Sequence, residues 1–267
     1  MTAETFRTLH KTPFIIPNPW DIGSARMLAG LGFKALATTS SGYAMTLGRR
    51  DYGISRDEAL DHARVISSAV DIPVSADLEN GFGLAPSHVF ETIKGACETK
   101  LAGGSIEDST GETDTPVIED DTLATERIQA AREAINKSGR DFVLTARAEA
   151  FLYGRGEINK IIDRLNAFAD AGADVLYAPG LPDLAAIRTV CANVSKPVNV
   201  LVLGDLAQHK AAEFYEAGAM RLSIGGGLAW SAYGILAQSR TILSDGSFDI
   251  LTANRDGAAI ISPFLEN

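Results

Sequence analysis

The sequence is poor in the residues that form disulfide scaffolds and soft-metal sites. Its 267 residues include only two cysteines, Cys97 and Cys191, and four histidines. Two cysteines are too few for a disulfide framework, so we expect a reducing compartment, the cytoplasm. The histidines fall near the N-terminus or within predicted helices, so no histidine-based metal site is predicted.

Long apolar runs and an excess of basic charge are also missing. No stretch approaches the roughly 20 apolar residues that span a bilayer. The first residues lack a basic segment followed by an apolar run, so no secretory signal is predicted. The 34 acidic residues outnumber the 24 basic ones, which argues against a nucleic-acid partner, because such proteins carry a basic surface. We therefore expect neither a membrane nor a nucleic acid as a partner.

The sequence does contain a weak repeat, in which a helix-like segment ends in glycine and a short apolar run follows at once. A glycine just past a helix end often adopts the left-handed backbone conformation. Parallel strands that are buried on both faces give short apolar runs of this kind. The glycines of the four copies are Gly32, Gly103–Gly104, Gly172 and Gly218.

Four more apolar runs follow a proline or a polar turn, which brings the predicted strands to eight. These strands are 14–17, 34–39, 73–76, 105–107, 142–145, 174–177, 197–200 and 220–224. Helical patterns accompany them at 21–31, 55–69, 86–102, 122–138, 157–171, 182–192, 207–217 and 228–243. Strict alternation predicts the α/β class. Eight units in a chain of this length favour a closed (β/α)8 barrel of the TIM type over an open doubly wound sheet. We expect one domain over 1–267, with 245–267 as a C-terminal tail.

Polar residues follow several of the predicted strands, at the barrel end where active sites are built. Four carboxylates, Asp51, Asp77, Glu79 and Glu107, are expected at this mouth. Like charges so close together disfavour joint ionisation unless a cation is present. Oxygen ligands without nearby histidine or cysteine suit Mg²⁺, or less well Mn²⁺. The alternative is that these carboxylates cap helices or pair with arginines.

Other side chains at the same end are suited to an anionic substrate. Arg147, after the fifth strand, presents a planar fork that binds a carboxylate through two hydrogen bonds. Thr39, Ser40 and Ser41 offer hydroxyl and backbone N–H groups to the same anion, although they would also suit an ordinary turn. Asn199 is expected after the seventh strand. No lysine is predicted at the mouth, so imine chemistry is not expected.

The order and spacing of four segments resemble the isocitrate lyase / phosphoenolpyruvate mutase superfamily, and the similarity runs over almost the whole chain. The resemblance implies an α/β barrel whose last helix is often exchanged between subunits of a homotetramer or homodimer. It also implies Mg²⁺ and a small 2-oxo or 2-hydroxy acid substrate. The four segments are Gly48-Arg-Arg-Asp51, Asp77-Leu-Glu-Asn-Gly-Phe-Gly83, Ser105-Ile-Glu-Asp108 and Thr145-Ala-Arg-Ala-Glu-Ala-Phe151.

The resemblance also assigns roles to residues. It makes Asp77 the direct metal ligand and matches Glu107 and Asp51 to outer carboxylates that act through water. Glu79 stands where many members have aspartate. It matches Arg147 to the arginine that binds the substrate carboxylate, and residues 39–41 to the loop that holds the same group.

The loop after the fourth strand departs from the superfamily pattern. The superfamily's lyases for isocitrate and methylisocitrate carry a cysteine acid/base on this loop, but 109–116 contains no cysteine, lysine or histidine. The asparagine of the mutase loop is also absent. Glu112, Thr113 and Thr115 are the candidate replacements.

The expected function is that of a Mg²⁺-dependent lyase that cleaves a C–C bond next to a pyruvate-type enolate. Arg147, Glu107 and Asp51 are the expected catalytic residues, and the partner is a small carboxylic acid. One alternative is P–C bond chemistry, as in phosphonopyruvate hydrolysis or carboxyphosphonate or phosphoenolpyruvate mutase-like transfer. Two others are a non-catalytic ligand-binding relative and an unrelated metal-dependent aldolase on the same fold.

Overall fold

Eight parallel strands form a barrel in the computed structural model, which describes residues 3–111, 116–252 and 255–265. The strand order is β1-β8-β7-β6-β5-β4-β3-β2. The backbone N–H of Ala37 donates to the carbonyl of Pro17 at 3.0 Å, which links the two end strands and nearly closes the ring. The strands are β1 (Phe14–Ile16), β2 (Leu36–Ala37), β3 (Val74–Asp77), β4 (Gly103–Glu107), β5 (Val143–Arg147), β6 (Val175–Tyr177), β7 (Val198–Leu201) and β8 (Arg221–Ser223).

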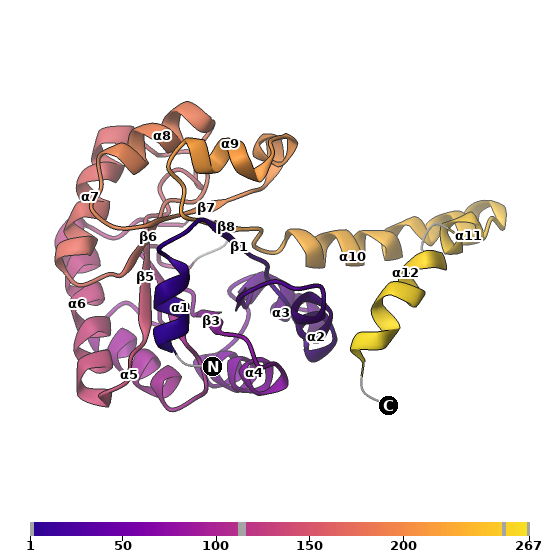
Figure 1. Ribbon diagram of the computed structural model, residues 1–267, viewed down its shortest axis with the longest axis horizontal. Helices are drawn as coiled ribbons and strands as arrows, with labels where there is room; N and C mark the ends of the chain where they lie inside the picture. Colours follow the sequence, from indigo (N-terminus) through magenta and orange to yellow (C-terminus); the bar gives the residue numbers. More distant parts are fainter. Residues whose placement is uncertain (1–2, 112–115, 253–254, 266–267) are drawn as a thin grey trace.

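Helices alternate with the strands and lie around the outside of the barrel (Figure 1), so the predicted (β/α)8 barrel is confirmed. The helices between successive strands are α2 (Ile22–Gly30), α3 (Ser40–Thr46), α4 (Arg56–Ala69), α5 (Pro86–Cys97), α6 (Asp121–Ser138), α7 (Ile158–Asp170), α8 (Leu184–Ala192), the 3-10 turn η1 (Gly204–Gln208) and α9 (Ala211–Glu216). The flanking elements are α1 (Ala3–Leu9), α10 (Gly227–Gln238), α11 (Arg240–Asp245), η2 (Asp249–Leu251), α12 (Arg255–Ile261) and η3 (Ser262–Phe264).

The repeated glycines behave as predicted in three of the four copies. Gly32, Gly172 and Gly218 have φ angles of 98°, 107° and 99°, in the left-handed region that follows a helix end. In the fourth copy the prediction is wrong, because Gly103 and Gly104 lie inside β4. A Cβ atom on Gly103 would lie 2.6 Å from the carbonyl oxygen of Val143, so close strand packing requires the glycine there.

Two predicted helices are interrupted, and one expected turn is a helix. The segment 207–217 divides into η1 and α9, and 228–243 divides into α10 and α11. The polar run after the second strand forms the first turn of α3, where the Thr39 side chain accepts a hydrogen bond from the Gly42 N–H as an N-cap. At the start of α4, Ser55 and Glu58 form a capping box.

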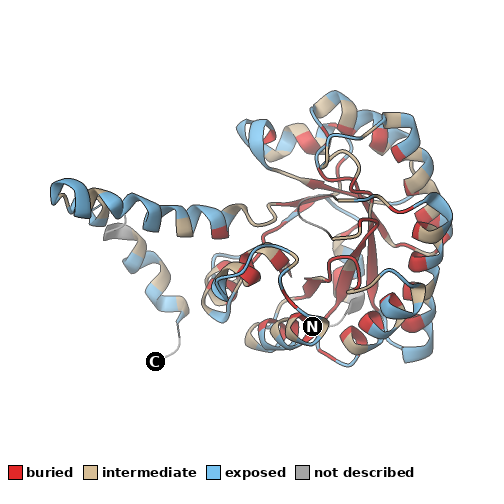
Figure 2. Ribbon diagram, turned by 180° about the vertical axis from the view of Figure 1, so that it is seen from behind, coloured by how far each residue is buried: buried red, intermediate tan, exposed pale blue. Residues whose placement is uncertain are grey.

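Apolar side chains fill the space between the strands and the helices and also close the N-terminal end of the barrel. Figure 2 shows the buried residues on the strands and on the helix faces that point toward them. Beneath the barrel, Phe6 of α1 packs with Phe14, Ile16 and Val143 in a separate apolar cluster. The opposite end, at the carboxyl ends of the strands, is therefore the open one.

Helix α10 occupies the place in the chain of the eighth barrel helix but extends away from the barrel (Figures 1 and 2). Trp230 and Leu236 on α10 are each 63% exposed. The chain then returns, and the ring of Phe264 in η3 packs against Gly30 of α2. Within the described residues, no helix is both long and apolar enough to cross a membrane.

Candidate active site

A cavity of about 510 Å³ opens at the carboxyl ends of the strands and continues into the barrel. It brings together all but one of the predicted site residues. The exception is Glu79, which borders a neighbouring hollow instead. The predicted residues that line the cavity are Thr39, Ser40, Ser41, Asp51, Asp77, Glu107, Arg147 and Asn199.

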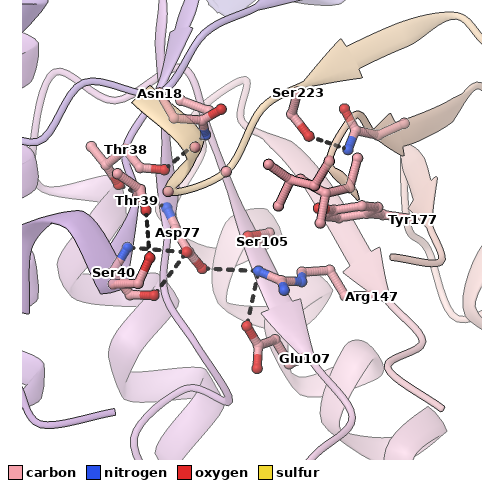
Figure 3. A pocket seen from close by; sticks show the side chains of 18 of the residues that line it. Asn18, Thr38, Thr39, Ser40, Asp77, Ser105, Glu107, Arg147, Tyr177 and Ser223 are labelled. Atoms are coloured by element: carbon pink, nitrogen blue, oxygen red, sulfur yellow. Dashed lines mark hydrogen bonds and ion pairs between the residues drawn. The ribbon is translucent and has the colours of Figure 1, made fainter. Parts of the chain in front are cut away.

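Arg147, the last residue of β5, is the centre of the polar network (Figure 3). Its Nη1 atom lies 2.8 Å from Glu107 Oε1 and 3.2 Å from Asp77 Oδ1. Its Nε atom donates to Glu149 Oε1 at 2.8 Å. The guanidinium group also lies over the Tyr177 ring, 4.9 Å from the ring centre. Arg147 is thus fixed in position by contacts on several sides.

Asp77 and Asp51 are joined by one serine. The Ser40 hydroxyl lies 3.0 Å from Asp77 Oδ2 and 3.1 Å from Asp51 Oδ1, and the Ser40 N–H also donates to Asp77 Oδ2 at 3.1 Å. Burial and the charge of Asp77 raise the pKa of Asp51. In the structure the N–H and hydroxyl groups of Ser40 therefore donate to protein carboxylates, whereas we predicted that they would donate to a substrate anion.

Two tyrosines close the site beside Glu107. The Tyr52 hydroxyl donates to Glu107 Oε2 at 2.6 Å and lies 3.0 Å from the Tyr153 hydroxyl. Burial, followed by the charge of Glu107, raises the pKa of Tyr52 well above its ordinary value. Tyr52 therefore remains a neutral hydrogen-bond donor toward the cavity at physiological pH.

Glu79 follows β3 and is held in an unusual conformation. Its φ is +48°, in the left-handed region that non-glycine residues seldom adopt. The side chain is 3% exposed, and its Oε1 atom has no hydrogen-bond partner among the described residues. Burial, followed by the charges of Asp77, Glu107 and Asp51, raises the pKa of Glu79 to about 9. Burial and the neighbouring carboxylates therefore disfavour ionisation of Glu79.

The donor chemistry of the site fits a hard divalent cation. The oxygen donors of the cavity are the carboxyl groups of Asp51, Asp77 and Glu107, and Glu79 borders the neighbouring hollow. Within 3–111, 116–252 and 255–265, however, no three acidic, histidine or cysteine side chains form a ready-made metal cluster. Mg²⁺ does not require one, because it commonly binds one or two carboxylates and keeps several waters.

The structure corrects the predicted position of Asn199. It is the second residue of β7, not a residue after that strand, and it is 1% exposed. Its amide nitrogen donates to the Ser223 hydroxyl at 2.8 Å, and its oxygen accepts from Arg221. Asn199 therefore lies deep in the cavity among side chains of β7 and β8.

Several side chains of the site were not predicted from the sequence. Glu149 is fully buried and stands two residues after Arg147. This spacing in an extended segment would place both side chains on the same face. Burial raises the pKa of Glu149 despite the neighbouring guanidinium group. The lid candidates Glu112, Thr113 and Thr115 lie outside the described residues. The other residues missed are Tyr52, Tyr153, Tyr177 and Arg221.

Comparisons with known proteins agree with this architecture. A structure from Burkholderia cenocepacia J2315, assigned as a lyase/mutase, is 48% identical, with 99% of this chain and 95% of that chain covered and a TM-score of 0.91. The structure of 2,3-dimethylmalate lyase is 26% identical, with 92% and 88% covered and a TM-score of 0.81.

Among curated sequences, 2-methylisocitrate lyase of Halalkalibacterium halodurans is 30% identical over 200 residues. The match covers 73% of this chain and 66% of that enzyme's length. Residues 6–243 match the phosphoenolpyruvate phosphomutase family. The named relatives are lyases or belong to a lyase/mutase group. The chain belongs to the phosphoenolpyruvate phosphomutase family, within the PEP mutase/isocitrate lyase superfamily of enzymes.

Proposed function

We propose that this chain is a Mg²⁺-dependent lyase that cleaves the C–C bond next to a pyruvate-type enolate in a small 2-oxo or 2-hydroxy acid. The observation that carries the proposal is the convergence of Arg147, Asp77 and Glu107 in one cavity at the carboxyl ends of the strands. Such a cavity combines an anion-binding fork with oxygen ligands for a cation, the two groups that a bound 2-oxo acid requires.

Asp77 would hold the cation directly, with Asp51, Glu79 and Glu107 acting through water. Bound there, Mg²⁺ supplies electrostatic stabilisation for negative charge that develops on the substrate oxygens. Arg147 Nη1 now contacts both Asp77 and Glu107. The same N–H edge of Arg147 faces the cavity and would bind a substrate carboxylate.

The remaining groups orient the substrate and exclude water. Thr39 and Ser41 place hydroxyls on the cavity wall opposite Arg147, with Thr39 Oγ1 and Ser41 Oγ 3.1 Å apart. Tyr177 supports the guanidinium plane from β6. Tyr52 and Tyr153 stand on the side of the cavity nearest Glu107 and hold that carboxylate in one orientation.

P–C bond chemistry is the second candidate, and the family match to phosphoenolpyruvate phosphomutase favours it. The two functions differ in their products. A C–C lyase releases a carbonyl fragment, whereas phosphonopyruvate hydrolysis releases phosphate.

The test is a turnover screen with Mg²⁺. The panel contains oxaloacetate, isocitrate, 2-methylisocitrate, substituted malates and phosphonopyruvate, with detection of 2-oxo acids, glyoxylate and free phosphate. The Asp77→Ala variant is the blank. A carbonyl product that is absent from the blank supports lyase activity. Release of phosphate supports P–C bond chemistry instead. Binding of a 2-oxo acid without any turnover would contradict both and favour a non-catalytic relative.

A further inference from the structure

Arg221 is a buried cation at the bottom of the active-site cavity. It is the first residue of β8, is 5% exposed, and lines the same cavity as Asp77 and Arg147. Its Nε donates to Asn199 Oδ1 at 2.8 Å, and its Nη2 donates to Thr145 Oγ1 at 3.1 Å. Its Nη1 lies 3.3 Å from His10 Nε2. Among the described residues, no carboxylate forms an ion pair with it.

None of these partners neutralises the charge. His10 Nδ1 lies 2.9 Å from the Phe6 carbonyl oxygen, which can only accept, so Nδ1 carries the proton and Nε2 accepts from Arg221. Burial, followed by the charge of Arg221, lowers the pKa of His10 to about 3, so the ring is neutral. Burial also lowers the pKa of Arg221, but only to about 10, so the guanidinium group is charged at neutral pH. A buried cation with only neutral partners is costly unless an anion joins it.

The barrel leaves room beside Arg221. The interior of a TIM barrel is usually filled by layers of bulky branched side chains. Here small side chains, Ala37, Ser75 and Ser105, line the cavity together with Arg221. Register places Ser105 beside Thr145, and Asn199 beside Arg221. The layer formed by Arg221, Asn199 and Thr145 is therefore open, polar and positively charged. The apolar cluster around Phe6 beneath it is packed.

The contact of Arg221 with Thr145 relates its position to that of Arg147 along β5. Thr145, which holds Arg221 Nη2, stands two residues before Arg147 on β5. Two residues of a parallel strand span about 6.6 Å. That depth is comparable with the length of a four- or five-carbon dicarboxylic acid. The Arg221 guanidinium group thus contacts β5 two residues before Arg147, and both arginines line one cavity.

We infer that Arg221 binds a second carboxylate of the substrate, so that the enzyme selects dicarboxylic over monocarboxylic acids. This inference rests on the proposed function, in which Arg147 receives the carboxylate next to the reacting carbon. The Arg221 guanidinium group uses three of its five N–H groups on Asn199, Thr145 and His10 and retains two for an oxyanion.

The test compares two ligands with the same 2-hydroxy acid head group. Lactate has one carboxylate, and malate adds a second at the far end. Calorimetric titration of the intact protein with Mg²⁺ should give at least about tenfold tighter binding of malate than of lactate, as expected for one charge-assisted contact. In Arg221→Met this preference should fall below about twofold. In Arg188→Met, which removes an exposed arginine on α8, it should be unchanged.

The outcomes separate this inference from the proposed function. Equal binding of malate and lactate by the wild type would overturn the inference, even if turnover is found in the screen. A malate preference that survives in Arg221→Met would also overturn it. If Arg221→Met does not fold, Arg221→Lys retains the charge without the fork and should lose most of the preference.

A free anion, such as formate or phosphate, could bind Arg221 in place of a second substrate carboxylate. If either ion raises the melting temperature of the wild type but not of Arg221→Met, while malate is not preferred, the layer binds a free ion and the substrate assignment is wrong. Because all of these measurements are of binding or stability, they remain decisive even if no substrate is turned over.

Discussion

Tyr52 makes the shortest hydrogen bond to Glu107, at 2.6 Å, and Tyr153 reaches this carboxylate through Tyr52. A hydrogen bond to a charged group contributes about 1.5–3 kcal/mol. We therefore expect Tyr52→Phe to lower kcat by about tenfold or more on the substrate identified in the screen. Tyr153→Phe is the matched control and should lower kcat by less than about threefold. Equal losses in the two variants would contradict this arrangement.

His10 makes the stability of the fold sensitive to acid. Its pKa is about 3 in the folded protein, below the ordinary value of 6.5, because burial disfavours the charged ring. Between these values the unfolded chain binds more protons, so the free energy of unfolding falls as the pH drops below 6.5. Linkage gives a loss of about 2 kcal/mol at pH 5 from this group.

Urea denaturation at pH 7 and pH 5 measures this effect. His10→Gln retains an acceptor for Arg221 but cannot titrate, so the difference in free energy of unfolding between the two pH values should shrink by about 2 kcal/mol relative to the wild type. An unchanged difference would mean that the ring is not buried in its neutral form.

Single residues differ in how far they can be predicted from sequence. Asp51, Asp77, Glu107 and Arg147 are predictable because a barrel places polar strand ends at one mouth. Arg221 is not, since its significance comes from the lack of a carboxylate partner in the part of the chain that the structure describes, and only the fold reveals its neighbours. The predicted roles of all these residues await the experiments above.

At the scale of elements, the turn after β3 depends on Arg127 of α6. This side chain is 1% exposed, and its Nη1 atom donates to the carbonyls of Gly83 and Leu84 at 2.7 and 2.8 Å. Its Nη2 atom donates to the Asn80 carbonyl. The same turn carries Glu79, so one arginine fixes the backbone of a site segment.

Arg127→Met should therefore destabilise the protein strongly. It leaves buried carbonyls without donors, and the expected loss is about 3 kcal/mol in the free energy of unfolding by urea denaturation. Lys137→Met, which removes an exposed cation from the same helix, should change the value by less than about 0.5 kcal/mol. Comparable losses in the two variants would show that the carbonyl contacts of Arg127 matter little.

The alternation of strands and helices can be predicted from the sequence because apolar runs and glycine-ended helices recur. Two local features cannot be predicted in this way. Residues 40–42 favour turns on their own, yet Thr39 caps a helix there. Gly103 and Gly104 look like a helix end, but contacts across the barrel, with Val143 and Phe142, determine their place in β4. In both cases tertiary packing decides between conformations that the local sequence leaves open.

At the scale of the whole molecule, α10 presents apolar side chains to solvent. Trp230 and Leu236 are exposed on α10, and Leu243 on α11 is 92% exposed. Burial of apolar surface is favourable at about 25 cal/mol per Å². We propose that these helices pack on a second subunit, as the resemblance to the superfamily implies.

Sedimentation velocity at micromolar concentration should accordingly give a dimer or tetramer of the 28.3 kDa chain. The double variant Trp230→Ser/Leu236→Ser should shift the distribution toward monomer, because it removes two large apolar groups from α10. A wild-type monomer under these conditions would contradict the proposed assembly.

The formation of a pyruvate-type enolate in the cavity can be tested without knowing the full substrate. A lyase that releases this enolate should also remove a methyl proton from pyruvate in the reverse direction. Proton NMR in D₂O measures the loss of the pyruvate methyl signal with Mg²⁺ present. We predict exchange faster in the wild type than in Asp77→Ala or in wild type without Mg²⁺. Exchange no faster than in these two controls would contradict the formation of a pyruvate-type enolate in this cavity.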